Sequence, residues 1–218
     1  MNLRDNENIW VLGGFLGATA LVSGLVLALV FTVTRGPVEK MQKQTLRNSL
    51  QMLALPEFDN APDREVKQFA SPAGYPVYIM PVRKAKQLKA FAVRCASPKG
   101  YAGDVEIMAG FTAEGRILAV LVTSHKETPG LGSNVCERKF RKTIFNFFKP
   151  LPPGLPPNPI LDQFTSLTPE RNGRWLVKRD GGSFDYVTGA TITSRAVLDA
   201  VEQAGKTLLA HKEEFFKP

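Results

Sequence analysis

The segment from Asp185 to Ser194, DYVTGATITS, gathers small residues and hydroxyl side chains just before an amphipathic helix. A helix N-terminus carries unpaired backbone N–H groups and the positive end of the helix dipole, which together favour a bound phosphate. Gly189 and Ala190 leave space for an anion to approach the backbone. Four hydroxyl groups surround the same point, those of Thr188, Thr191, Thr193 and Ser194. The residues alone allow two interpretations, a phosphate site or a helix start that is capped by the hydroxyl of Thr193 or Ser194.

A second segment, HKETPGLGSNV from His125 to Val135, directly follows the most apolar of the predicted strands. Pro129 fixes one φ angle, and the glycines after it allow positive φ and close approach of the backbone to a ligand. Taken alone, this pattern is also typical of an ordinary turn between a strand and a helix. Two loops of this kind in one chain strengthen the prediction of a ligand site.

The elements that must position these two segments are strands in the middle of the chain and a helix at its end. Runs rich in branched and aromatic residues predict four strands, at residues 75–82, 89–97, 105–112 and 116–124. The short loop 113–115 predicts a hairpin between the last two strands. We further predict a helix over 134–148, a strand over 174–180 and a final helix over 196–216. Helices and strands segregate along the chain, so the predicted fold class is α+β.

The composition limits what else the chain can do. It has 218 residues and a formal net charge of +8, with two cysteines and two histidines. One folded domain with an appendage fits this length. There are too few cysteines and histidines for a disulfide framework or for a structural zinc or haem site, and the sequence leaves open whether Cys95 and Cys136 pair. Six prolines between Pro150 and Pro159 predict an extended surface loop.

The N-terminal region predicts a membrane anchor. After a tail of residues 1–8, the 25 residues 9–33 contain no charge. About 20 apolar residues cross a bilayer core, and the apolar part of a secretory signal has only about 7–15, so we predict an uncleaved transmembrane helix. Residues 34–74 are predicted to form a juxtamembrane helix, which begins near Pro37, and a linker. One cation precedes the span and four follow it closely, which by charge bias would leave the large domain in the cytoplasm.

The segment at Asp185 resembles the flavinylation motif of the FMN-binding domain family. That motif has an Asp, two free positions, Ser or Thr, and then Gly-Ala-Thr, and it is recognised by an ApbE-type flavin transferase. The match here has no gap and consists of Asp185, Thr188, Gly189, Ala190 and Thr191. The resemblance implies FMN attached by a phosphodiester to the Thr191 hydroxyl, with Asp185 read by the transferase. It also implies that five further residues contact the cofactor, namely Thr188, Gly189, Ala190, Thr193 and Ser194.

The second segment is similar to the loop that lies along the flavin ring in this family. The shared sequence is Glu-Thr-Pro-Gly-Leu-Gly after a strand, which implies flavin contacts from Glu127, Thr128, Leu131 and Gly132. The resemblance covers the anchor and the chain from about Gly100 onward. His125-Lys126 and the compact length resemble the G subunits of Rnf ion-translocating electron-transport complexes more than the C subunits of Na+-translocating NADH:quinone reductases. The loop 150–159 departs from the family pattern.

The resemblance implies that residues 75–218 form a mixed α+β FMN-binding domain that relays electrons and turns over no substrate by itself. The complex would couple ferredoxin and NAD redox chemistry to Na+ or H+ movement. The expected partners are its other membrane subunits, the transferase and the lipid bilayer, whose anionic surface accounts for the positive charge; no nucleic acid is expected. The family places the flavin domain on the periplasmic side of a bacterial or archaeal cell membrane. We follow the family, because charges in a large translocated domain constrain topology weakly. The alternative is a non-redox, membrane-tethered module that binds a phosphate ligand reversibly.

Overall fold

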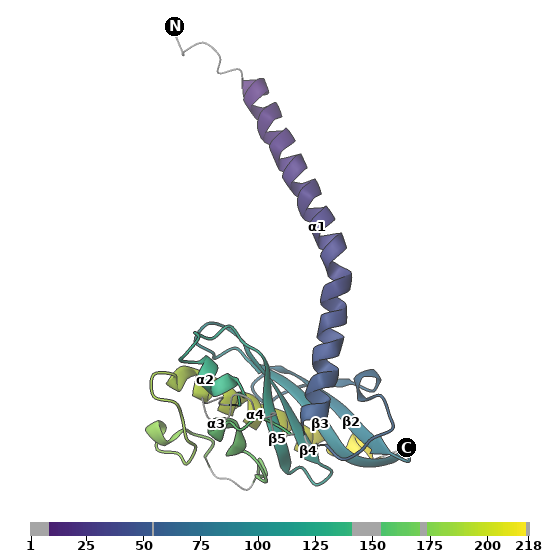
Figure 1. Ribbon diagram of the computed structural model, residues 1–218, viewed down its shortest axis with the longest axis vertical. Helices are drawn as coiled ribbons and strands as arrows, with labels where there is room; N and C mark the ends of the chain where they lie inside the picture. The colour runs from purple at the N-terminus through teal and green to yellow at the C-terminus, as the bar shows by residue number, and fades with distance from the viewer. Residues whose placement is uncertain (1–8, 54, 141–153, 171–173, 217–218) are drawn as a thin grey trace, which may run out of the picture. The chain divides into compact units, whose positions relative to one another are not determined.

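The computed structural model describes residues 9–53, 55–140, 154–170 and 174–216 (Figure 1). The chain divides into two compact units, Met1–Thr45 and Leu46–Pro218. The first unit contains most of the long helix α1 (Ile9–Met52). The second contains a five-stranded sheet and the remaining helices, so the predicted α+β class is confirmed.

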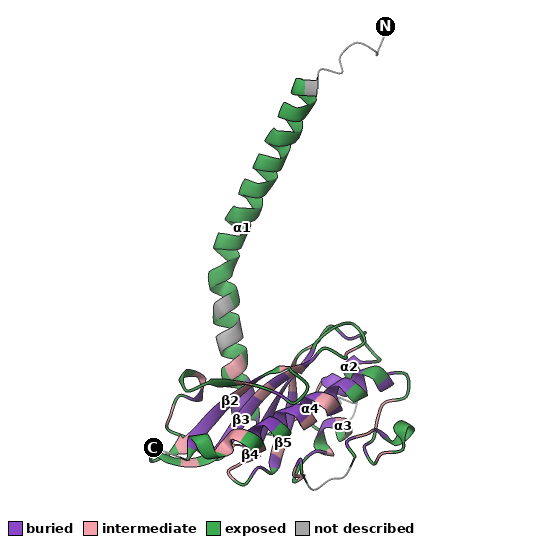
Figure 2. Cartoon of the chain, turned by 180° about the vertical axis from the view of Figure 1, so that it is seen from behind, coloured by how far each residue is buried: buried purple, intermediate pink, exposed green. Residues whose placement is uncertain are grey.

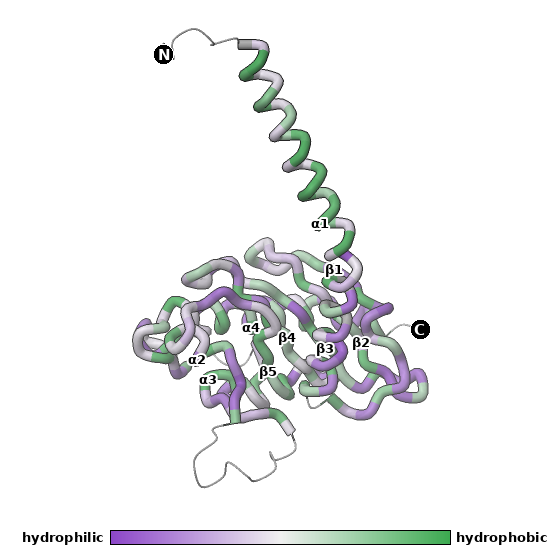
Figure 3. Tube along the Cα trace, turned by 45° about the horizontal axis from the view of Figure 1, so that its top comes forward, coloured by the Kyte–Doolittle hydropathy of each residue, from purple (hydrophilic) through white to green (hydrophobic). Residues whose placement is uncertain are grey.

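Helix α1 is apolar over a stretch long enough to cross a bilayer. That stretch, Trp10–Val38, has a mean hydropathy of 2.3 and appears mainly in the hydrophobic colour of Figure 3. None of it is buried. The sequence predicted a new helix near Pro37, but α1 continues through this residue. A proline removes one helix hydrogen bond, and α1 continues on both sides of Pro37 with the rest of its hydrogen bonds.

The sheet is antiparallel throughout, and its strands lie side by side in chain order. Four strands and the β4–β5 hairpin were predicted, and the structure confirms them. The edge strand β1 was not predicted, because it has only four residues and they are largely exposed. The strands are β1 (Lys67–Ala70), β2 (Pro76–Lys84), β3 (Gln87–Ser97), β4 (Val105–Thr112) and β5 (Ile117–Ser124).

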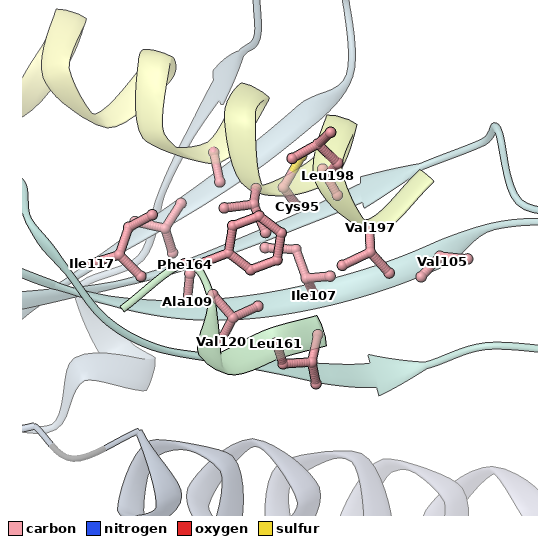
Figure 4. Close-up of a cluster of buried hydrophobic side chains, with 14 of the residues drawn as sticks. Cys95, Val105, Ile107, Ala109, Ile117, Val120, Leu161, Phe164, Val197 and Leu198 are labelled. Carbon is pink, nitrogen blue, oxygen red and sulfur yellow. The ribbon is translucent and has the colours of Figure 1, made fainter. Parts of the chain in front are cut away.

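Helix α4 (Thr191–His211) covers one face of this sheet (Figure 2). It confirms the predicted final helix, although it begins five residues earlier and is followed by the 3-10 turn η3 (Lys212–Phe215). Its apolar side packs on alternate residues of the strands, as the two-residue period of a strand requires. Figure 4 shows this core, which includes Ile107, Val120, Phe164 and Val197. The start of α4 is therefore fixed relative to the strand ends.

The opposite face of the sheet packs against the last turns of α1. Leu50 and Leu53 are buried there beside Met80 and Met108. The compact unit accordingly begins at Leu46. The sequence assigned residues 34–74 to a juxtamembrane helix and a linker. The structure shows that this segment supplies part of the domain core and contains β1 and the 3-10 turn η1 (Pro62–Arg64).

The helix predicted over 134–148 is largely wrong where it can be compared. Helix α2 (Ser133–Cys136) ends after one turn, and Glu137 is extended with φ −93° and ψ 134°. The next side chain, Arg138, turns inward and donates hydrogen bonds to the carbonyls of Val120 and Pro156. These buried contacts outweigh the helical pattern. Residues 141–148 lie outside the described part of the chain.

The strand predicted over 174–180 is also wrong. A single bridge joins Val177 to Phe184, and the 3-10 turn η2 (Lys178–Asp180) follows. Trp175 stacks on Phe164 and Phe184 in the core, and its Nε1 donates to a backbone carbonyl. The aromatic packing, and not strand pairing, fixes this segment.

The proline-rich loop leads into a short helix, α3 (Pro159–Asp162), and its residues 150–153 lie outside the described part. Asn158 is buried, and its side chain accepts hydrogen bonds from the backbone of Ile160 and Leu161. Asn158 thus anchors the last part of the loop to the domain, while Gly154, Pro157 and Pro159 are exposed, as expected for a surface loop.

The two cysteines are separate, buried thiols. Burial is the main cause that raises the pKa of Cys95 to about 12, with nearby carboxylates as a second cause. Burial likewise raises the pKa of Cys136 to about 12. Both thiols are therefore protonated and unreactive at neutral pH.

Candidate functional site

The two segments singled out from the sequence meet at one cavity of about 480 Å³. The cavity lies where the loop after β5 approaches the first turn of α4. Its lining consists of Tyr101, Glu127, Thr128, Leu131, Gly132, Arg179, Gly189, Ala190, Thr191, Ile192 and Thr193. Two loops that are distant in sequence thus form one site, as their patterns suggested.

The N-terminus of α4 opens into this cavity without a side-chain cap. The N-cap residue is Ala190, and no side chain bonds to the first turn from that position. Among the described residues, the N–H groups of Thr191, Ile192 and Thr193 have no acceptor. The prediction that Thr193 or Ser194 caps the helix is wrong, because both lie inside the helix. Three free amides and the helix dipole together favour an anion here.

The hydroxyls of Thr193 and Ser194 are used for internal hydrogen bonds. Thr193 Oγ1 donates to Glu127 Oε2 at 2.7 Å. Ser194 Oγ donates to the Ala190 carbonyl at 3.0 Å and accepts from the N–H of Val187 at 3.3 Å. Both residues are buried and hold the start of α4 in place. Ser194 does not line the cavity, whereas Thr193 does.

Glu127 joins three segments of the chain. Its side chain is buried, with 5% of the residue exposed. One carboxylate oxygen accepts from the N–H of Tyr101 at 2.8 Å and of Ala102 at 3.4 Å, and the other accepts from Thr193. The sequence predicted Glu127 as a flavin contact, and the structure adds a positioning role. Tyr101 was missed, because no local pattern marks the turn before β4 as part of the site.

Two glycines are needed for different reasons. A Cβ on Gly132 would lie 2.6 Å from Glu127 Oε2 and 2.8 Å from Thr193 Oγ1, so no side chain fits. Gly189 has φ +85°, which other residues rarely adopt. Gly130 has φ +80° after Pro129, as the turn predicted. The backbone therefore comes close to the cavity from both sides.

Thr191 is the first residue of α4, and it lines the cavity. Only 6% of the residue is exposed. Its Oγ1 accepts a hydrogen bond from Arg179 Nη1 at 3.2 Å. Arg179 belongs to η2, and no sequence pattern marks it as a site residue, since the contact depends on how the turn folds against α4.

Two residues of the motif lie outside the cavity lining. Asp185 is exposed, and its carboxylate pairs with Lys178 Nζ at 2.5 Å. Thr188 is also exposed and makes no side-chain hydrogen bond among the described residues. Both are placed where another protein can reach them.

The rim of the cavity is apolar, in contrast to its anion-binding end. Tyr101, Leu131 and Ile192 come from three different segments, and they are 70%, 48% and 45% exposed. The volume falls within the range of about 300–1,000 Å³ found for small-molecule pockets. The donor groups and the apolar rim together fit a ligand with a planar apolar part and a phosphate, such as a flavin mononucleotide.

The fold and this cavity define a domain that fits a phosphate-bearing ligand and that follows an apolar N-terminal helix in the chain. Residues 100–206 match the FMN-binding domain family, and this range includes every residue of the cavity lining. FMN is accordingly the cofactor that the site fits.

Relatives cover nearly the whole chain. The G subunit of the ion-translocating oxidoreductase complex of Pseudomonas aeruginosa (strain UCBPP-PA14) is 34% identical over 93% of this chain and 90% of its own length. Proteins of the same name from Pseudoalteromonas atlantica and Cereibacter sphaeroides (strain ATCC 17029) are 29% and 31% identical, over 94% and 95% of this chain and 90% and 88% of their own lengths. The chain therefore belongs to the family of G subunits of ion-translocating oxidoreductase complexes.

Proposed function

We propose that this chain is a membrane-anchored flavoprotein subunit that relays electrons through FMN attached covalently to Thr191. The observation that carries the proposal is the start of α4, where a threonine hydroxyl lines the cavity beside three backbone N–H groups that find no acceptor among the described residues. Family membership supports FMN and a redox role. In a helix start that is merely capped, a side chain would accept hydrogen bonds from those N–H groups, so their lack of an acceptor within the described ranges favours a phosphate site over the capped-helix interpretation.

Each wall of the cavity has a separate task in this proposal. FMN supplies the electron chemistry when it is bound. The N–H groups at the start of α4 hold its phosphate, and the loop 127–132 lies beside its ring. Glu127 keeps that loop and α4 together through the Thr193 hydroxyl. The exposed rim leaves one edge of the ligand open, which electron transfer to a partner protein requires.

The attachment is tested by producing the full chain with an ApbE-type transferase and export, and by measuring its intact mass and in-gel ultraviolet fluorescence. Wild type is expected to gain the mass of one FMN less water, and Thr191→Ala to gain nothing. Thr191→Ser keeps the hydroxyl and should still be modified. Thr165→Ala, an exposed threonine outside the motif, is the matched control. Unmodified wild type beside a modified control substrate would overturn covalent attachment.

Reversible binding of a phosphate ligand remains the second candidate, since the free N–H groups at α4 would serve it equally well. Acid precipitation separates the two. Covalent flavin stays with the pellet, and a reversibly bound ligand is released into the supernatant. The partners that copurify also separate an Rnf-type complex from a Na+-translocating NADH:quinone reductase, whose C subunit would occupy the same position.

We also propose that the flavin domain lies on the periplasmic side of the cell membrane. The family supports this orientation against the charge count around α1. Reporter fusions after residue 218 test it: alkaline phosphatase should be active there and green fluorescent protein dark. The opposite pattern would place the domain in the cytoplasm.

The whole complex would couple electron flow between ferredoxin and NAD to Na+ or H+ movement, with this chain as one link. Complex that contains Thr191→Ala should assemble with its normal subunits and lose ferredoxin–NAD electron transfer. Complex that contains Thr165→Ala should retain it. Full electron transfer by the Thr191→Ala complex would remove this chain from the path.

A further inference from the structure

Three consecutive residues of η2 each contact the segment that holds the flavinylation motif. Lys178 pairs with Asp185 at 2.5 Å. Arg179 donates to the Thr191 hydroxyl at 3.2 Å. Asp180 accepts two hydrogen bonds from Arg195, at 2.7 and 2.5 Å. One turn of the chain therefore fixes the motif before, at and after the acceptor threonine.

Arg179 differs from its two neighbours because its side chain contacts an uncharged group. Lys178 and Asp180 each face a group of opposite charge, whereas the partner of Arg179 is a neutral hydroxyl. Asp180 is held by both nitrogens of the Arg195 fork, and this contact is the main cause that lowers its pKa. Within the described part of the chain, Arg179 forms no ion pair with a carboxylate, and its charge is only the last of the causes that lower the pKa of Asp180. The Arg179 guanidinium thus lines the cavity as a positive charge that can pair with an anion.

The turn that carries Arg179 is well defined. Gly181 ends η2 in the left-handed conformation with φ +80°. A Cβ on Gly182 would lie 1.9 Å from the Leu176 carbonyl oxygen, so only glycine fits at this position. The bridge between Val177 and Phe184 closes the loop. Arg179 is consequently presented from a fixed backbone and not from a free loop.

We propose that Arg179 is the positioning residue for flavin attachment and the ionic partner of the attached phosphate. The inference rests on the proposed function. Before attachment, the guanidinium holds the Thr191 oxygen toward the cavity. After attachment, the same nitrogens face the phosphodiester, which carries one negative charge, and a charge-assisted bond replaces the bond to a neutral oxygen.

The attachment step balances as a phosphoryl transfer. A phosphodiester cannot form from free FMN without activation, so the donor is an anhydride of FMN, and FAD is such a compound. The Thr191 oxygen forms a bond to the phosphorus that bears riboflavin, and the bond from that phosphorus to the bridging oxygen of the anhydride breaks. AMP leaves with that oxygen, and the hydroxyl proton passes to the transferase or to water. Arg179 offsets the negative charge that builds up on the phosphoryl oxygens.

The test measures flavin transfer to the purified full chain in detergent, with FAD and an ApbE-type transferase. Arg179→Gln removes the charge, and Arg179→Lys keeps it without the fork. Arg116→Gln is the matched control, because that exposed arginine lies in the β4–β5 turn, at the opposite end of β5 from the site. We expect kcat/KM for transfer to fall about tenfold or more in Arg179→Gln. It should recover in part in Arg179→Lys and stay unchanged in Arg116→Gln.

A second measurement does not depend on the transfer rate. The melting temperature of each protein is compared before and after flavin attachment. Attachment should raise it in wild type and Arg116→Gln, and raise it less in Arg179→Gln, because the new phosphate then lacks its ionic partner.

The outcomes separate the two proposals. If wild type is not modified at all, the proposed function fails. If wild type is modified at Thr191 and Arg179→Gln matches it both in kcat/KM and in the melting shift, the role of Arg179 is wrong and covalent attachment stands. Slower transfer together with a smaller melting shift in Arg179→Gln confirms both halves of the inference.

Discussion

The two walls of the cavity are built in contrasting ways. The inner wall, residues 125–132, is held by one buried carboxylate, which accepts hydrogen bonds from Tyr101, Ala102 and Thr193. The outer wall, residues 178–190, is held at the surface by ion pairs from η2. A buried polar group that loses its partner costs about 1–3 kcal/mol or more, whereas an exposed ion pair contributes about 0–1 kcal/mol. The inner wall should therefore determine stability and the outer wall the placement of charge.

Removal of the Glu127 side chain is expected to have the largest effect on stability and therefore tests the role of the inner wall most directly. Glu127→Ala leaves three donors on two segments, the N–H groups of Tyr101 and Ala102 and the Thr193 hydroxyl, without their acceptor, so we expect a loss of about 2–4 kcal/mol in the free energy of unfolding. Glu127→Gln keeps the shape and one acceptor, and should cost less. Urea unfolding of the detergent-solubilised chain measures the loss, and hydrogen exchange at the Tyr101 and Ala102 amides shows where it arises. A cost below about 0.5 kcal/mol would mean that the inner wall does not depend on this carboxylate.

Replacing one glycine in each wall by alanine compares directly how much each wall contributes to stability. Gly132→Ala places a Cβ against Glu127 and Thr193 in the inner wall, and such overpacking costs about 1–3 kcal/mol. Gly189→Ala in the outer wall meets only Leu131, at 3.4 Å, and its strain at φ +85° costs about 1–2 kcal/mol. Urea unfolding should rank Gly132→Ala as the more costly change. The reverse order would show that backbone strain and not space limits the site.

The pair between Asp180 and Arg195 should give the outer wall a weak dependence on pH. Its hydrogen bonds lower the pKa of Asp180 in the folded chain. The stabilisation is therefore present above the unfolded pKa, about 3.9, and is lost as the pH falls through the lower folded value. The melting temperature of Asp180→Asn should lie slightly below that of wild type near pH 7, and the two should converge below about pH 3.9. A constant difference at every pH would assign the effect to something other than ionisation.

The smallest effect is expected for Lys178→Ala. Both side chains of its pair with Asp185 are more than half exposed, so the free energy of unfolding should change by no more than about 0.5 kcal/mol. Urea unfolding in low and high salt checks this value. A loss above about 1 kcal/mol would show that the outer wall contributes to stability as the inner wall does.

The sequence predicted the parts of the fold that depend on local pattern. Runs of branched and aromatic residues identified β2 to β5, and the 3.6-residue period identified α4. Glycine and proline marked both loops of the cavity. Local pattern failed for residues 137 and 138, where the buried guanidinium of Arg138 outweighs helix propensity. It also failed at Pro37, because one proline removes a single helix hydrogen bond and α1 continues on both sides of it.

The missed parts of the site depend on contacts that are distant in sequence. Thr193 was a reasonable cap by its type and position, but its hydroxyl bonds to Glu127, 66 residues earlier. Tyr101 and Arg179 reach the cavity only once β4 and α4 are packed. Such contacts leave no periodic trace in the chain, which is why the two loops could be predicted to form a site and their positioning partners could not.

The surroundings of Thr191 are discontinuous in sequence, because residues from the turn at 101, the loop at 127 and η2 line the same cavity as this residue, and Arg179 of η2 contacts its hydroxyl. An unfolded chain emerging from a translocation pore has none of this environment. Under the proposed function, maturation therefore has a fixed order of translocation, folding and cofactor loading. The flavin donor and the transferase must then be available in the compartment where the domain folds, and a domain that misfolds is never loaded.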